Sequence, residues 1–205
     1  MLQRTARIIV PPILKLMSGG QVNSVRQARR METTKWAVPI RLPGVPNLHR
    51  LNDDLYRSGQ PTPAGFRHLE ALGIRSCLSL RTHRRDDGDA IGTPILCKSV
   101  PLLGVIVTDD DIVEAMIDLR YKLPRPVLIH CYQGSDRTGL FCAAYRILVE
   151  GWTKKEAIAE MVRGGFGFHE LYSSFVTYLC DFDETKLKER LARYASRSGS
   201  QEKTH

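Results

Sequence analysis

The segment HCYQGSDRTG, residues 130–139, places a cysteine, a glycine and an arginine within a few positions of one another. A thiol is a good nucleophile at neutral pH only when its thiolate is stabilised by a helix N-terminus or by nearby positive charge. Gly134 can take the backbone angles that turn successive N–H groups toward an anion. The planar fork of Arg137 matches two oxygens of a phosphate. Such a loop stabilises both a thiolate on Cys131 and a phosphate dianion, so the segment predicts phosphoryl transfer to sulfur.

The flanking residues predict where this loop lies. The segment RPVLIHC (125–131) is short and nearly all apolar, which is typical of a central parallel strand covered on both faces. Apolar residues at helical spacing follow from Thr138 and stop at Gly151. The loop would therefore join the carboxyl end of a buried strand to the amino end of a helix, a position that suits an anion.

Strands and helices alternate along the rest of the chain. Helical patterns follow Thr62, Thr108 and Thr153, which are potential N-caps, with an adjacent aspartate as the alternative to Thr108. We expect strands within 53–62, 74–81, 95–103 and 125–131, and helices at 63–73, 108–123, 138–151, 154–165, 168–180 and 183–195. This order predicts an α/β domain with a central, mainly parallel sheet flanked by helices.

The positive charge of the chain is concentrated at its N-terminus. The net charge is +8, but residues 1–31 hold six basic residues and no acidic one, while the remainder holds 24 basic and 22 acidic residues. A nucleic-acid-binding domain would spread a basic face through its fold, so we expect no nucleic-acid partner. We expect a basic, disordered leader at 1–35, one domain at 36–196 and a polar tail at 197–205.

The leader and the cysteines bear on location. The apolar run of the leader, about ten residues long and interrupted by Pro11, Pro12 and Lys15, is too short to span a bilayer. A weak membrane-surface anchor and an inefficient export signal are alternatives to a disordered arm. The five cysteines lack the close pairing of a disulfide scaffold or a zinc site, which favours a reducing, cytoplasmic location. The alternative is an exported or membrane-tethered protein.

HCYQGSDRTG resembles the signature His-Cys-x-x-Gly-x-x-Arg-Thr/Ser-Gly of the cysteine-dependent protein tyrosine phosphatases. The wider pattern resembles a bacterial dual-specificity-like branch of that superfamily. The stretches that carry the resemblance are NLHRLNDDLYRSGQPTPAGFRHLEALGIRSCLSLR, PVLIHCYQGSDRTGLFCAAYRILVEGW and EAIAEMVRGGFGFHE, about half of the chain and in the family's order.

The resemblance implies a role for each residue of the loop. Cys131 would be the nucleophile that forms a cysteinyl-phosphate, and Arg137 would clamp the phosphate. Thr138 would donate a hydrogen bond to the sulfur and help the phosphoenzyme hydrolyse, while His130 would hold the shape of the loop. The backbone N–H groups that would bind the phosphate belong to Tyr132, Gln133, Gly134, Ser135, Asp136 and Arg137.

The sequence departs from the family pattern at the position of the general acid, the residue that protonates the leaving oxygen. The family usually supplies an aspartate from a mobile loop before the cysteine, but residues 102–107 here contain no acid. Asp109, Asp110 and Asp111 follow, where they also suit the first turn of a helix. Asp136 is the rival, because an aspartate in this place has the acid role in myotubularin-like lipid phosphatases. Asp136 could instead brace the loop, and Asp109 is the other position that we carry forward.

Other segments suggest supporting roles. LYRSGQP resembles a family element near the active site, so Arg57 and Gln60 are candidates for support. Arg84 and Arg85 in RTHRRDDGD could face an acidic substrate, but a solvated charged loop is the simpler interpretation. RGGFGFHE lacks the Lys-Ser/Thr of a nucleotide-binding loop, and His169 is expected to be structural.

The resemblance implies hydrolysis of phosphotyrosine in proteins, with phosphoserine and phosphothreonine as further substrates. It implies no metal and no cofactor, because the cysteine and the backbone amides do what a metal would otherwise do. The alternatives are an inositol phospholipid phosphatase, a phosphate-binding module without activity, and a sulfur-transfer or arsenate-reducing enzyme. The loop lacks the lysines that often accompany a preference for inositol phospholipids. We expect a monomer that acts on phosphorylated protein substrates.

Overall fold

The computed structural model describes residues 35–82, 86–102 and 106–201, with side chains described up to residue 198. Residues from Trp36 onward form one unit of the chain. Three sequence-based expectations fall outside the described residues: the leader as far as residue 34, the roles of Arg84 and Arg85, and the last four residues of the tail.

The described strands form one sheet in the order β1-β2-β3-β6-β4-β5. The strands are β1 (Val38–Pro39), β2 (His49–Arg50), β3 (Leu55–Ser58), β4 (Ser76–Ser79), β5 (Leu96–Ser99) and β6 (Val127–His130). Strands β3, β6, β4 and β5 run parallel to one another, and β1 and β2 add an antiparallel edge. The expected α/β class with a mainly parallel sheet is therefore confirmed.

Most of the described helices begin and end close to the predicted positions. The helices are α2 (Pro63–Ala71), α3 (Asp109–Ile117), α4 (Asp136–Leu148), α5 (Lys154–Arg163), α6 (Ser173–Asp181) and α7 (Glu184–Gln201). Helix α6 begins five residues after its predicted start, and α7 ends six residues after its predicted end. A π-helical turn, Asp118–Lys122, extends α3, and a 3₁₀ turn, Glu170–Tyr172, precedes α6. The hydroxyls of Thr62, Thr108 and Thr153 cap α2, α3 and α5, as the sequence predicts. Helix α7 runs to Gln201, so it includes the first residues of the expected tail.

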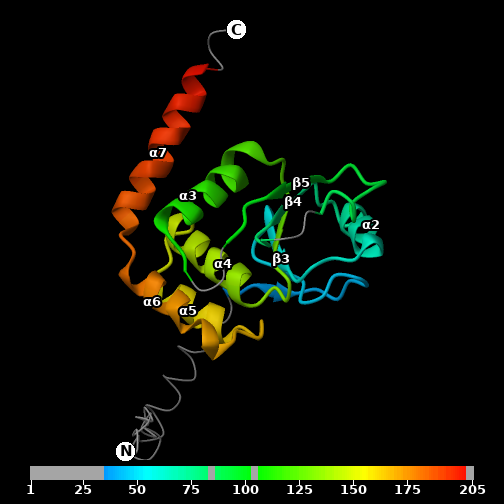
Figure 1. Ribbon diagram of the computed structural model, residues 1–205, viewed down its shortest axis with the longest axis horizontal. Coiled ribbons are helices and arrows are strands. Elements are labelled where there is room, and N and C mark those ends of the chain that lie inside the picture. The colour runs from blue at the N-terminus through cyan, green and yellow to red at the C-terminus, as the bar shows by residue number, and fades with distance from the viewer. Residues whose placement is uncertain (1–34, 83–85, 103–105, 202–205) are drawn as a thin grey trace, which may run out of the picture. The chain divides into compact units, whose positions relative to one another are not determined.

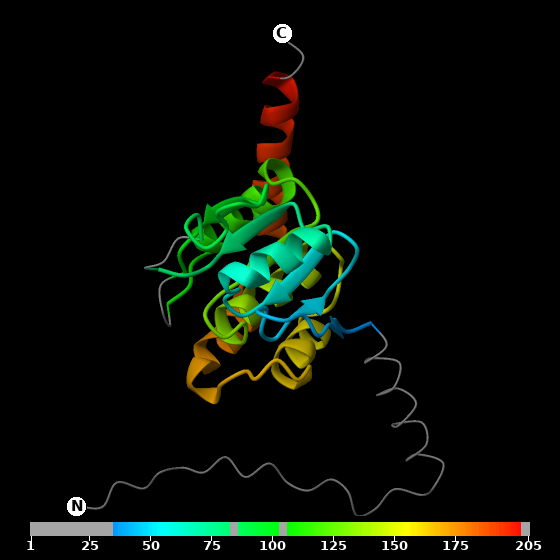
Figure 2. The ribbon, with the colours of Figure 1, turned by 90° about the vertical axis from the view of Figure 1, so that its right-hand side faces the viewer.

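Side chains of the central strands alternate between two hydrophobic cores, one on each face of the sheet. On β6, Val127 and Ile129 pack in one core with Phe141 of α4, and Leu128 packs in the other with Phe66 of α2. Figure 1 shows α2 on one side of the sheet and α3 and α4 on the other, and Figure 2 looks onto α2 in front of the strands. Strand β6 is covered on both faces, which explains its apolar sequence.

A buried ion pair fixes α5 to α4. Arg146 in α4 donates from Nε and Nη2 to the two carboxylate oxygens of Glu160 in α5, at 2.9 and 2.8 Å. Glu160 also accepts a hydrogen bond of 2.6 Å from the backbone N–H of Ala37. Both charged side chains are almost fully buried, so removing Arg146 would leave the Glu160 carboxylate as a costly uncompensated charge. The pair thus fixes the helix that leads into residues 164–169, which pack on the functional loop.

Candidate active site

The predicted loop joins the carboxyl end of β6 to the amino end of α4. Strand β6 ends at His130, Cys131 follows with only 3% of its surface exposed, and α4 begins at Asp136. The helix begins two residues before the predicted start, so Arg137 and Thr138 lie in its first turn. Ligands of parallel α/β sheets bind at this edge, and the positive end of the helix dipole favours an anion there.

The backbone carbonyls of the loop are bound by groups that lie around it. The contacts are His130 Nδ1 with Cys131 O (3.1 Å), Gln60 N with Tyr132 O (2.9 Å), Asn47 Nδ2 with Gln133 O (3.1 Å) and Arg57 Nη2 with Gly134 O (2.7 Å). Across a trans peptide, each carbonyl points away from the N–H that follows it. Within the described part of the chain, the N–H groups of 132–135 have no protein acceptor. They are therefore free to bind an anion inside the loop.

Arg57 supports the loop from β3. Its side chain is almost completely buried, its Nη2 binds the Gly134 carbonyl, and its guanidinium lies 3.7 Å from the centre of the Phe166 ring. Burial lowers the pKa of this guanidinium from its usual value, but an arginine remains protonated in proteins. Arg57 thus places a fixed positive charge beneath the loop, as its sequence context suggests.

Arg137 and Thr138 extend from the first turn of α4. Arg137 is half-buried, and its Nη1 donates to the carbonyl of Leu80 at 3.3 Å, at the end of β4. The hydroxyl of Thr138 is buried and has no hydrogen-bond partner within the described residues. Burying a hydroxyl without a partner is costly, which favours a partner supplied by a ligand or by an ionised neighbour.

Gly134 lies where the loop meets β3. Its φ is +76°, and an added Cβ would lie 2.4 Å from the carbonyl carbon of Ser58. We therefore expect Gly134→Ala to displace the loop and abolish the binding of an oxyanion such as vanadate. Titration calorimetry with vanadate, together with urea unfolding, measures both effects.

Gly165 provides a matched control for this substitution. Its φ of +81° is similar, but a Cβ there would meet nothing within 4 Å. Gly165→Ala should cost only the strain of a left-handed alanine, about 1–2 kcal/mol, and should leave vanadate binding intact. Equal losses of vanadate affinity in the two variants would show that close contact with Ser58 does not set the loop geometry.

Residues 166–169 pack against the outer side of the loop. Ser135 Oγ donates to the carbonyl of Phe166 at 2.7 Å, and Asn47 Nδ2 donates to the same carbonyl at 2.9 Å. The carboxylate of Asp136 accepts the backbone N–H of His169 at 2.9 Å and also contacts its ring Nδ1 at 2.9 Å. The glycine-rich stretch is thus a docking segment for the loop, and His169 has a structural contact.

Asp109 joins α3 to two other helices. Its carboxylate accepts hydrogen bonds from Tyr178 Oη in α6 at 3.1 Å and from Lys186 Nζ in α7 at 3.3 Å. Burial and the charge of Asp109 raise the pKa of Tyr178 above its usual value. The two neighbouring contacts are Asp110 with Arg190 (2.5 Å) and Asp111 with Thr108 (2.8 Å). Each aspartate at the start of α3 therefore has a structural contact, and a catalytic role for Asp109 stays a prediction.

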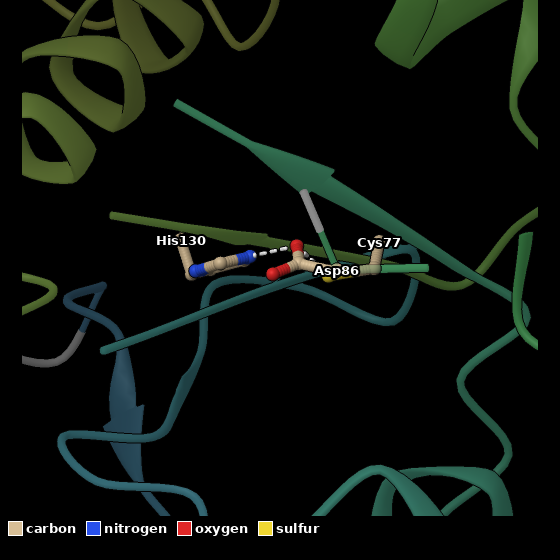
Figure 3. Close-up of side chains that lie close together, drawn as sticks. All are labelled: Cys77, Asp86 and His130. Atoms are coloured by element: carbon tan, nitrogen blue, oxygen red, sulfur yellow. Dashed lines mark hydrogen bonds and ion pairs between the residues drawn. The ribbon is translucent and has the colours of Figure 1, made fainter. Parts of the chain in front are cut away.

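Asp86 is a residue of the site that the sequence pattern does not reveal. It lies in RTHRRDDGD, which reads as a solvated loop, yet only 3% of its surface is exposed. Its carboxylate contacts His130 Nε2 at 2.6 Å (Figure 3). It also accepts a hydrogen bond of 2.8 Å from Gln60 Nε2. Asp87 beside it is exposed, so local sequence gives no sign of which aspartate turns inward.

Cys77, Asp86 and His130 form a buried group whose ligand atoms lie within 4.8 Å of one another (Figure 3). Two ligand atoms bound at about 2.0–2.1 Å to a tetrahedral zinc ion would lie roughly 3.3 Å apart. The contact of 2.6 Å between Asp86 and His130 is shorter and is that of a direct hydrogen bond. Burial, with the charge of Asp86, also raises the pKa of the Cys77 thiol well above its usual value. The group is thus arranged as a hydrogen-bonded cluster.

No family model matches the sequence. The chain is 34% identical over 164 residues to the dual specificity protein phosphatase TpbA of Pseudomonas aeruginosa, with 78% of this chain and 73% of the relative covered. It is 27% identical over 157 residues to an inositol diphosphatase of Arabidopsis thaliana, with 71% and 74% covered.

Solved structures of TpbA also resemble the chain. A crystal structure of P. aeruginosa TpbA matches with a TM-score of 0.69 at 32% identity, covering 77% of this chain and 97% of that chain. A crystal structure of a TpbA variant in complex with pTyr matches with a TM-score of 0.69 at 30% identity, covering 77% and 96%.

Proposed function

Since the chain belongs to the dual-specificity class of the cysteine-dependent protein tyrosine phosphatases, we propose that it hydrolyses phosphotyrosine in protein substrates through a cysteinyl-phosphate intermediate. The observation that best supports this is the loop itself. Its carbonyls are bound on the outside, its N–H groups are free, and it begins at the buried Cys131. The complex of a TpbA variant with pTyr adds support from a protein of the same fold.

In the first step, the thiolate of Cys131 attacks the phosphorus of the bound ester. The S–P bond forms, the P–O bond to the tyrosine breaks, and the leaving oxygen takes up a proton. In the second step, water attacks the phosphorus, the S–P bond breaks, and phosphate leaves with the thiolate restored. The N–H groups of 132–137 and the bidentate fork of Arg137 hold the phosphoryl oxygens in both steps. The hydroxyl of Thr138 donates to the sulfur and eases its departure.

Phosphotyrosine is the first candidate substrate and an inositol phosphate the second. Between Cys131 and Arg137 the loop carries no lysine, and Tyr132 exposes 64% of its surface with its ring centre 5.2 Å from the Arg81 guanidinium. An aromatic face next to the nucleophile suits an aryl ester better than a polyanionic ring. We expect kcat/KM to be higher for a phosphotyrosine peptide than for a phosphoserine peptide or an inositol diphosphate. A higher kcat/KM for the inositol diphosphate would contradict the assignment of phosphotyrosine as the substrate.

The proton of the leaving oxygen has two candidate donors from the sequence, Asp136 and Asp109. Both oxygens of Asp136 contact His169, so its carboxylate is directed at the docking segment. We therefore expect Asp136→Asn to lower kcat/KM by similar factors on tyrosine phosphate and on an activated aryl phosphate. Loss of a general acid would spare the activated aryl phosphate, because its leaving group needs little protonation. Equal losses of kcat/KM on the two substrates would therefore indicate that Asp136 supports the structure of the loop.

A general acid would give a different result. Its loss should slow tyrosine phosphate by roughly 10² or more relative to the activated ester, the usual scale of general acid catalysis. Such selectivity in Asp136→Asn would identify Asp136 as the general acid, as one sequence interpretation predicts. The same selectivity in Asp109→Asn would instead identify Asp109, at the start of α3, as the general acid. Asp110→Asn, which alters a more exposed carboxylate in the same helical turn, is the matched control.

We propose a catalytic domain that begins at residue 36, with the leader at 1–35 outside it. The bond from Ala37 N–H to Glu160 supports this boundary, since it ties the start of the domain to α5. Among the described residues, no helix has the length and apolar character needed to cross a membrane. In this proposal the enzyme acts in the cytoplasm as a monomer on phosphorylated proteins, without a nucleic-acid partner.

A further inference from the structure

Asp86 stands directly behind the junction of β6 and the loop. Its Oδ2 lies 2.6 Å from His130 Nε2, and His130 has no exposed surface. The opposite ring nitrogen of His130, Nδ1, lies 3.1 Å from the carbonyl oxygen of Cys131. One imidazole ring therefore connects Asp86 to the backbone of the proposed nucleophile.

The hydrogen bonds around Asp86 determine which of its two carboxylate oxygens could carry a proton. Arg81 Nη1 lies 2.8 Å from Gln60 Oε1, and because arginine can only donate, this contact fixes the orientation of the amide. Gln60 Nε2 must then donate to Asp86 Oδ1, at 2.8 Å. A proton on Asp86 could lie only on Oδ2, in the contact with His130.

The hydrogen-bond partners of the His130 ring determine in the same way which of its nitrogens carry protons. A backbone carbonyl has no proton, so the contact with Cys131 O is a hydrogen bond only if Nδ1 carries one. Nε2 faces a carboxylate oxygen, which is also an acceptor when ionised. With Asp86 ionised, both ring nitrogens are donors and the ring is an imidazolium.

The groups that face Asp86 favour its ionised form. Burial opposes the charge, while the hydrogen bond and charge of His130, the hydrogen bond from Gln60 and the charge of Arg81 together lower the pKa of Asp86. Of these, Gln60 and Arg81 favour the carboxylate whatever the protonation state of His130. On the neighbouring strands, Cys77 of β4 has its Sγ 3.8 Å from Oδ2 and acts as a weak donor. The charge of Asp86 also contributes to raising the pKa of Cys97 on β5, to about 12, mainly an effect of burial. Both of these thiols are therefore neutral beside Asp86.

We propose that Asp86 is a positioning residue for phosphoryl transfer, acting through His130. The carboxylate holds the ring as a doubly protonated donor, which turns the Cys131 carbonyl away from the anion site and places positive charge next to the sulfur. Opposite charge close to a thiol favours its thiolate. The inference rests on the proposed function, because it assigns Asp86 to the same reaction.

The first test uses the wild-type full-length chain and needs no turnover. Nitrogen-15 NMR of the histidine rings, with the His130 signals assigned by their loss in His130→Gln, reports whether each ring nitrogen carries a proton. We expect both nitrogens of His130 to be protonated at neutral pH. A neutral ring, or a stoichiometric bound metal found by elemental analysis, would overturn the proposal.

The second test measures Cys131 directly in Asp86→Asn. The rate at which iodoacetamide labels the peptide that contains Cys131, followed by mass spectrometry across pH, reports the thiolate fraction. We expect labelling at mildly acidic pH to fall about tenfold or more, the effect of losing roughly 1.4 kcal/mol of thiolate stabilisation, and to recover at high pH. Asp87→Asn, the same change in the exposed neighbour, should leave the pH profile unchanged.

A purely structural role would change other quantities. It would lower the melting temperature and vanadate affinity of Asp86→Asn without moving the pH profile of labelling, and that outcome would refute a positioning role. Because labelling and NMR do not depend on catalysis, either test can fail while the enzyme still hydrolyses phosphotyrosine. Conversely, loss of the proposed function would appear as absent turnover in the wild-type protein.

Discussion

Replacing Cys131 with serine is expected to abolish phosphate release from a phosphotyrosine peptide, while vanadate or sulfate still binds in the loop. The chemistry requires the sulfur, since a serine hydroxyl is a much weaker nucleophile than a cysteine thiolate. Binding requires the N–H groups of 132–135 and Arg137, which the substitution leaves in place. Steady-state phosphate release and calorimetry with sulfate measure the two properties separately.

Cys180→Ser is the matched control for this substitution, because it makes the same change at an exposed cysteine in α6. It should retain wild-type turnover. Undiminished turnover in Cys131→Ser would end the cysteinyl-phosphate proposal. Loss of sulfate binding together with turnover would mean that the thiol is needed for the shape of the loop.

Arg137→Lys is expected to lower kcat by about 10³-fold or more, the range found when an arginine that stabilises a phosphoryl transition state is removed. Lysine keeps the charge but loses the planar fork that binds two oxygens at once, and it loses the bond from Nη1 to the Leu80 carbonyl. The control is Arg163→Lys, at the exposed end of α5. A kcat for Arg137→Lys within tenfold of wild type would show that charge alone is sufficient.

The parts of this fold that follow local rules could be predicted from sequence. The hydroxyls of Thr62, Thr108 and Thr153 each cap a helix by accepting a backbone N–H three residues further along the chain. Such a contact depends only on neighbouring residues, so a threonine before an apolar helical pattern predicts it. The apolar run of β6 similarly predicted a strand covered on both faces. The short strands β1 and β2 do not follow such local rules, since β1 forms by pairing with β2 and β2 by pairing with β3.

The surroundings of the loop could not be predicted, because their contacts join distant parts of the chain. Asp86 meets a histidine 44 residues away, and Asp136 meets one 33 residues away. From sequence alone, Asp86 and the exposed Asp87 are equivalent. For Asp136 the sequence left two roles open, and the contact with His169 favours the bracing role.

The most direct test of the account is to trap the intermediate itself. The full-length enzyme would be mixed with an activated aryl phosphate, quenched in acid within milliseconds, digested and analysed by mass spectrometry. We expect a phosphate adduct on the peptide that contains Cys131, at the level of a pre-steady-state burst of the phenol. A burst without phosphorus on that peptide, or phosphorus on any other residue, would contradict the assignment of Cys131 as the nucleophile.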